Sequence, residues 1–186
     1  EEPVRVDEMA DHLRLHAGLN EDPYLNDLIA AARGYIETVT NRQLLNATWE
    51  VRLPCFPGSF CTPLPLLPVP VSSVTSVTYV DESGVNRVWP TSDYQVDLAA
   101  EPAEILPGYQ LQWPTTRHVV GAVKVRFVAG YGTTGSAVPA SVRHLIKLLV
   151  AHWYENREPV NIGNIVNELP MAVESLLWQQ RVFGAM

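Results

Sequence analysis

The longest periodic apolar segment lies between Val138 and Pro159, and its pattern predicts an amphipathic helix. Apolar residues recur at helical spacing along one stripe, opposite a charged face. The stripe contains Val142, Leu145, Ile146, Leu149 and Trp153. Pro139 suits the first helical turn because it lacks an N–H, whereas Pro159 cannot continue a helix. Leu148 and Tyr154 lie outside the stripe, so we expect this helix to contact more than one neighbour, in this chain or in another copy of it.

Two further helices are predicted in the N-terminal part of the chain. The first takes Asp7 as its N-cap and ends before Gly18, which is a typical terminator. The second begins with Asp22 as its cap and Pro23 in its first turn, and it ends at Asn41, which suits the left-handed cap position. Because a short turn joins them, the two helices are expected to pack as a hairpin.

From Ala47 the apolar period changes from 3.6 to 2, which is typical of strands. The runs Val74–Val80 and Val85–Trp89 flank an Asp-Glu-Ser-Gly turn and predict a hairpin. Other strands are expected at Trp49–Leu53, Tyr94–Leu98 and Val123–Phe127, and from Ile105. The proline-rich stretch Pro54–Pro70 is expected to be extended and loop-like.

The order of these elements predicts an α+β fold. It consists of a helical bundle, with two N-terminal and two C-terminal helices, and an inserted antiparallel β-rich block. We place the helical core at residues 1–46 and 136–186 and the β-rich insertion at residues 47–135. The last helix is expected to begin at Pro170.

Composition narrows the classes of function. With 186 residues and 47% hydrophobic content, the chain can bury a sizeable core. Its formal net charge of −7 argues against a general nucleic-acid binder, which would carry a basic patch. The sequence has no run of 18 apolar residues, so we expect no membrane-spanning helix.

The segment Gly130–Gly135 matches the pattern G-x-G-x-x-G, which in dinucleotide-binding folds precedes a helix that faces the pyrophosphate. Here Pro139 delays the helix beyond the motif, and the preceding strand follows an antiparallel block. We therefore interpret the motif as a glycine-rich connection between strand and helix. A small-ligand or nucleotide-binding enzyme that uses this loop is the alternative hypothesis.

Other candidate chemical groups favour structural interpretations. His12 and His16 would share a helix face, but no third metal ligand accompanies them, so we expect two surface histidines. Cys55 and Cys61 are expected to be reduced thiols. The alternatives are a local disulfide, which would close a very short loop, and a metal site, which would need two further ligands. His152 borders the apolar stripe and is expected to be partly buried. The residues therefore predict no catalytic site, no cofactor and no metal.

The ordered segments of the chain resemble head–tail connector proteins (adaptor, or head-completion, proteins) of long-tailed bacteriophages and related prophages. The matching segments are Leu28–Leu45, Trp49–Val51, Val71–Tyr79, Tyr94–Asp97, Val123–Gly132, Leu149–Glu158 and Glu168–Leu177. The resemblance covers nearly the whole chain. It rests on the order and spacing of many segments, since no single motif is diagnostic.

This resemblance implies a structural virion protein without enzymatic activity. It implies a homo-oligomeric ring of about a dozen copies beneath the portal protein, a dodecamer built on closed cyclic symmetry. Such a ring extends the DNA channel and offers a platform for the stopper or tail-completion protein. It would lie in the virion neck, and in the host cytoplasm during assembly. A monomeric protein-interaction module is a further alternative.

The genome would pass through the lumen of such a ring without sequence-specific binding. We expect acidic residues to face the lumen, because like-charge repulsion keeps DNA from adhering. Leu148 and Tyr154 are the candidates for contact with the next copy. Trp178, Arg181 and Phe183 are the candidates for contact with the portal or another neck protein, since aromatic and arginine side chains anchor interfaces.

Overall fold

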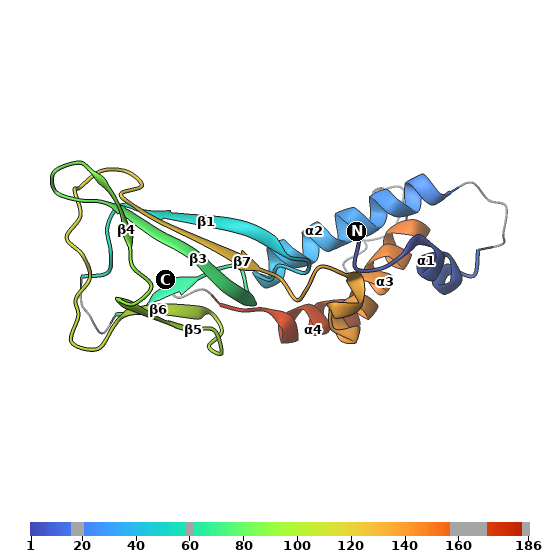
Figure 1. The fold of residues 1–186 in the computed structure, drawn as a ribbon. Helices are drawn as coiled ribbons and strands as arrows, with labels where there is room; N and C mark the ends of the chain where they lie inside the picture. The colour runs from blue at the N-terminus through green and yellow to red at the C-terminus, as the bar shows by residue number, and fades with distance from the viewer. Residues whose placement is uncertain (16–20, 59–61, 157–170, 184–186) are drawn as a thin grey trace, which may run out of the picture. The chain divides into compact units, whose positions relative to one another are not determined.

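A computed structural model describes residues 1–15, 21–58, 62–156 and 171–183. The chain forms two compact units (Figure 1). Unit 1 comprises Glu1–Leu45 and Gly132–Arg181, and unit 2 comprises Asn46–Tyr131 and Val182–Met186. Helices at both ends of the chain flank an antiparallel β block, so the predicted α+β class is confirmed.

Unit 1 contains the helices α1 (Val6–Leu13), α2 (Asp22–Thr40), α3 (Ala140–Glu155) and α4 (Met171–Gln180). Both α2 and α3 contact the other three helices and so form the centre of this unit. The predicted stripe of α3 is buried at Val142, Leu145, Ile146 and Leu149, while Trp153 is partly buried. The stripe therefore forms the seam of the helical core, as its spacing predicts, and Val150 is buried beside it.

Both ends of α1 differ from their predicted positions. Arg5, not Asp7, occupies the N-cap of α1, and Asp7 lies in the first turn, where its carboxylate pairs with Arg5. The helix ends at Leu13 because Arg14 adopts a left-handed conformation, with φ 56°. Gly18, the predicted terminator, lies outside the described residues.

The two ends of α2 and the start of α3 lie within one residue of their predicted positions, whereas α3 ends at Glu155, before the predicted stop at Pro159. Asp22 is the first residue of α2 rather than its cap, and Asn41 takes the predicted left-handed position, with φ 56°. Pro139 occupies the N-cap of α3 rather than its first turn. Pro159 and Pro170 lie outside the described residues.

Unit 2 contains two antiparallel sheets. The four-stranded sheet has the order β1-β7-β3-β4, and the three-stranded sheet has the order β2-β6-β5. The strands are β1 (Ala47–Leu53), β2 (Leu64–Leu66), β3 (Val71–Val80), β4 (Asn86–Trp89), β5 (Tyr94–Asp97), β6 (Ala103–Pro107) and β7 (Val123–Ala129). The predicted hairpin is confirmed by the pairing of β3 with β4. The prediction of a proline-rich loop missed β2, which pairs with β6 at the edge of its sheet, where proline is tolerated.

One hydrophobic core joins the inner faces of the two sheets. The buried residues of the four-stranded sheet are Val71, Val77, Trp89, Val123, Val125, Phe127 and Ala129, and those of the three-stranded sheet are Leu64, Leu66, Tyr94, Ala103 and Ile105. Phe56 completes this core and stacks on Trp113 with ring centroids 5.0 Å apart. Trp49 lies on the same side of β1 as Val51 and Leu53, yet it is 42% exposed because β1 is an edge strand. Because the shared core lies between the two sheets, their outer faces point away from each other.

Candidate functional site

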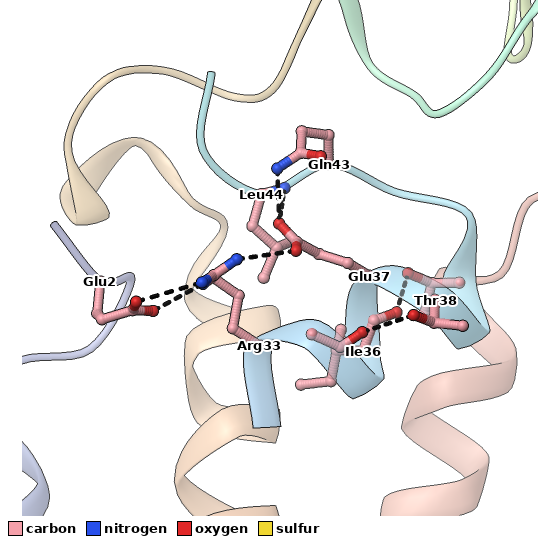
Figure 2. A network of polar contacts seen from close by, with 9 residues as sticks. Glu2, Arg33, Ile36, Glu37, Thr38, Gln43 and Leu44 are labelled. Atoms are coloured by element: carbon pink, nitrogen blue, oxygen red, sulfur yellow. Dashed lines mark hydrogen bonds and ion pairs between the residues drawn. The ribbon is translucent and has the colours of Figure 1, made fainter. Parts of the chain in front are cut away.

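A polar network within unit 1 joins the N-terminal segment to α2. Figure 2 shows the guanidinium of Arg33 between the carboxylates of Glu2 and Glu37. Arg33 Nε donates to Glu2 Oε2 at 2.7 Å, and another guanidinium nitrogen donates to Glu37 Oε2 at 3.0 Å. The second oxygen of Glu37 accepts the Leu44 N–H at 3.0 Å and the Gln43 side-chain amide at 2.8 Å. The hydrogen bond to Glu2 is the main cause of a raised pKa at Arg33.

The glycine-rich loop is packed against that same N-terminal segment. Gly135 N–H donates to Glu1 Oε1 at 3.2 Å, so a carboxylate already occupies this donor. A Cβ on Gly135 would lie 2.7 Å from the Glu2 carbonyl oxygen, and one on Gly132 would lie 2.5 Å from Ala137 Cβ. Close packing, against backbone at Gly135 and against the Ala137 side chain at Gly132, therefore accounts for glycine at these two positions without a bound phosphate.

The two candidates for contact with the next copy lie on α3 in different surroundings. Leu148 is partly buried. The hydroxyl of Tyr154 donates to the Glu21 carboxylate, and its ring centroid lies 6.1 Å from that of Tyr24. Tyr154 therefore connects the end of α3 to the start of α2. A contact of Tyr154 or Leu148 with the next copy stays a prediction.

Two of the three candidates for contact with a neck partner lie together. Trp178 on α4 is 62% exposed, and the Arg181 guanidinium carbon lies 5.4 Å from the centroid of its ring. This geometry is typical of a cation–π contact. Phe183, which falls in the segment assigned to unit 2, is 63% exposed. The structure therefore brings Trp178 and Arg181 together, and the partner of all three residues stays a prediction.

The structure pairs His12 with a residue that the sequence does not indicate. Its ring lies edge to face with His144 of α3, with centroids 6.3 Å apart. Burial lowers the pKa of His12, and the charges of His144 and Lys147 lower it further. Lys147 in turn pairs with Glu8 at 3.0 Å. His16, the expected neighbour of His12, lies outside the described residues.

The other candidate chemical groups form no chemical centre in the described part of the chain. Among its His, Cys, Asp and Glu residues, no group of three or more is arranged to hold a metal ion. Cys55 is a free, exposed thiol, whereas Cys61 lies outside the described residues. None of the described helices has both the length and the apolar composition that a membrane crossing requires.

Comparisons with known proteins give similarity at the level of structure. No family model and no curated protein sequence matches the chain. A chain from the neck of an empty gene transfer agent (GTA) particle, computed with C6 symmetry, has a TM-score of 0.76 at 26% identity. That match covers 99% of this chain and 92% of the other.

Two further structures agree with this match. A chain from the virion of a native gene transfer agent particle has a TM-score of 0.77 at 25% identity, covering 99% of this chain and 92% of the other. A chain from the neck of a native GTA particle, computed with C12 symmetry, has a TM-score of 0.71 at 27% identity, covering 97% and 90%. The chain is therefore similar over nearly its whole length to proteins of the neck of gene transfer agent particles, and its resemblance to head–tail connector proteins is confirmed.

Proposed function

We propose that this protein is a structural component of the neck of a phage-like particle, where it acts as the head-to-tail adaptor. The observation that carries the proposal is the similarity to a GTA neck chain, which has a TM-score of 0.76 and covers 99% of this chain. A match of this extent includes both the helical unit and the β unit. The proposal assigns the chain no catalytic role and no cofactor.

In the proposed particle the chain forms a closed ring beneath the portal protein. The neck structures that it resembles were computed with C6 and C12 symmetry, which supports a ring with about a dozen copies. In such a ring each copy presents one surface to the copy before it and a different surface to the copy after it. Leu148 and Tyr154 remain our candidates for one of these surfaces.

The ring would extend the DNA channel from the portal to the stopper or tail-completion protein. Trp178, Arg181 and Phe183 are our candidates for the contact with the portal or another neck protein. The net charge of −7 supports a lumen that repels DNA and so lets the genome pass without binding. A lumen lined mainly by lysine and arginine would contradict this part of the proposal.

The experiment is reconstitution of the full chain with the portal protein of its own particle. Native mass spectrometry and electron microscopy of the mixture should show one ring of this chain on each portal, with cyclic symmetry. The assay includes the portal because a subunit that assembles only on a template is monomeric alone. If the chain and the portal do not associate at micromolar concentration, the proposed adaptor role is wrong.

A further inference from the structure

The outer face of the four-stranded sheet carries a net positive charge in an acidic protein. Arg52 of β1 lies opposite Lys124 of β7, and Glu50 of β1 lies opposite Arg126 of β7. These residues alternate with Val51, Val123, Val125 and Phe127, which point toward the core. Glu50 accepts hydrogen bonds from Arg52 at 2.7 Å and from Arg126 at 3.0 Å, so one carboxylate is shared between two guanidinium groups. This face therefore combines three cations with one anion.

Lys124 is the cation of this face that is available for an external carboxylate. The ion pairs of the described residues include Arg52 and Arg126 but not Lys124. On the adjacent strand β3, Lys124 lies opposite Thr78, which carries no charge. The Thr78 hydroxyl lies 3.5 Å from the Lys124 carbonyl oxygen. The Lys124 ammonium group therefore has no anion to balance it within the described part of the chain.

The outer face of the three-stranded sheet carries the opposite charge. Asp97 of β5 lies directly opposite Glu104 of β6, and both alternate with inward-facing residues such as Val96 and Ile105. In the described part of the chain, neither carboxylate takes part in an ion pair. The surrounding sequence, residues 88–116, contains four acidic residues and no lysine or arginine. Like charges directly opposite each other destabilise a strand pair, and a cation from outside would relieve the repulsion.

The two charged faces point in opposite directions because one hydrophobic core lies between the sheets. A single copy therefore cannot bring its basic face onto its own acidic face, but two copies in head-to-tail order can. We propose that the outer face of the four-stranded sheet of one copy docks against the outer face of the three-stranded sheet of the next. Lys124 then lies against Asp97 and Glu104 of its neighbour. This inference rests on the proposed ring and specifies one of its contacts.

Charged faces of this kind determine the orientation in which two copies bind more than the affinity between them. A single exposed ion pair contributes little to stability, whereas complementary faces select one arrangement and exclude the reversed one. In a ring, the contact of basic face with acidic face gives every copy the same direction around the axis. The affinity for the ring then comes mainly from the apolar contacts and from the portal.

The chain offers a direct chemical test because it contains only two lysines, Lys124 and Lys147. A carbodiimide joins an amine to a carboxylate in direct contact without adding a spacer. Rings on the portal are formed from an equal mixture of ¹⁴N and ¹⁵N protein, cross-linked, digested and analysed by mass spectrometry. The expected product is a mixed-isotope peptide pair that joins Lys124 to Asp97 or Glu104. The Lys147–Glu8 pair, which lies within one chain, should appear as the same-isotope control.

Charge reversal provides an independent test. Lys124→Glu and Glu104→Lys should each weaken ring formation on the portal by about tenfold, and the combined variant should recover most of it. Thermal unfolding of each free variant checks that the β unit remains folded, and Asp97→Lys replaces Glu104→Lys if that variant does not fold.

The outcomes separate this contact from the ring itself. If wild-type rings form but Lys124 gives no mixed-isotope link to Asp97 or Glu104, the face-to-face contact is wrong and the adaptor ring stands. The contact is equally wrong if both single reversals assemble like the wild type. If the wild-type chain forms no ring on its portal, both the ring and this contact are wrong.

Discussion

Arg33 and Glu2, which lie 31 residues apart in sequence, form an ion pair with a separation of 2.7 Å between Arg33 Nε and Glu2 Oε2. Both side chains are only about 30% exposed, so water screens the pair less than it would screen a pair on the open surface. The same guanidinium contacts Glu37, whose carboxylate holds the N–H of Leu44. One arginine thus connects the N-terminal segment to α2 and to the residues that follow α2.

Replacement of this arginine should destabilise the helical unit. Arg33→Met keeps the length of the side chain but leaves Glu2 and one oxygen of Glu37 without their cation. Loss of hydrogen bonds to charged partners predicts a decrease of about 2 kcal/mol in the free energy of unfolding. Urea titration followed by circular dichroism measures this change.

Arg5→Met is the matched control. Arg5 also pairs with a carboxylate, that of Asp7, but its side chain is 71% exposed. Exposed pairs contribute little, so this variant should unfold like the wild type. Equal losses in the two variants would mean that the burial of the Arg33 pair has no energetic consequence.

Gly135→Ala should disturb the packing between the glycine-rich loop and the N-terminal segment. The new Cβ would lie 2.7 Å from the Glu2 carbonyl oxygen and 2.9 Å from that of Pro3, and both contacts are to backbone. Overpacking of this kind predicts a loss of about 1–3 kcal/mol in unfolding free energy.

Gly34→Ala gives the opposite expectation and serves as the comparison. Gly34 lies inside α2, and an added Cβ would meet no atom within 4 Å. Alanine stabilises a helix interior by about 0.5–1 kcal/mol relative to glycine, so this variant should resist urea better than the wild type. If both glycine variants are stabilised, the predicted clash at Gly135 is wrong.

The stability of the helical unit should depend on the protonation of His12. Burial lowers the pKa of His12 in the folded chain below its ordinary value near 6.5, and His144 and Lys147 lower it further. Between the two pKa values the unfolded chain binds more protons than the folded chain, so the free energy of unfolding decreases as the pH falls through 6.5. Denaturation at pH 7.5 and at pH values down to 5 should reveal this decrease.

The variant His12→Gln should lose much of this dependence, whereas His118→Gln, in the other unit, should retain it. The carboxylates of Glu50 and Asp81 have lowered pKa values because they accept hydrogen bonds, mainly from Arg52 and from the Val85 backbone respectively. Their contribution to stability is therefore lost mainly as the pH falls through the ordinary pKa values of 4.5 for glutamate and 3.8 for aspartate, below the range in which His12 titrates. An identical pH profile in the wild type and in His12→Gln would contradict the assignment.

The sequence predicts well what depends on local periodicity. The α3 stripe is visible because Val142, Leu145 and Leu149 repeat at helical spacing, and burial of one face follows from that spacing. Alternation likewise locates β7, where Val123, Val125 and Phe127 are all buried. Helix ends are less predictable, because the cap of α1 depends on Arg5 and on a left-handed Arg14, which have no strong sequence signature.

Contacts between distant segments are the part that the sequence does not reveal. Arg33 with Glu2, His12 with His144 and Tyr154 with Glu21 each join residues from separate elements, so their proximity exists only after the helices have packed. The strand β2 is hidden for a different reason. A three-residue segment with proline at its centre has no period to detect, and its pairing with β6 is also a tertiary contact.

Exposure of Trp178 predicts a role in partner binding rather than in folding. Trp178→Ala should leave the unfolding temperature of the free chain nearly unchanged and weaken binding to the portal by at least about tenfold, which is typical of a central aromatic anchor. Val173→Ala on the same helix is the control, because Val173 is buried at 2% exposure and its truncation should lower stability instead. Normal portal binding by Trp178→Ala would remove this residue from the proposed interface.

Leu148 tests the proposed contact between copies on α3. Leu148 is only partly buried, so the carboxylate of Leu148→Asp can reach water and the free chain should remain folded. The new charge would lie in the proposed contact between copies, so ring formation on the portal should be lost. The adjacent variant Leu149→Asp is the control, because Leu149 is fully buried and an unpaired carboxylate there should unfold the helical unit. Circular dichroism of the free variants and electron microscopy of portal mixtures distinguish the two effects. If Leu148→Asp also unfolds, Leu148 belongs to the core of unit 1, and if it forms normal rings, the contact between copies lies elsewhere.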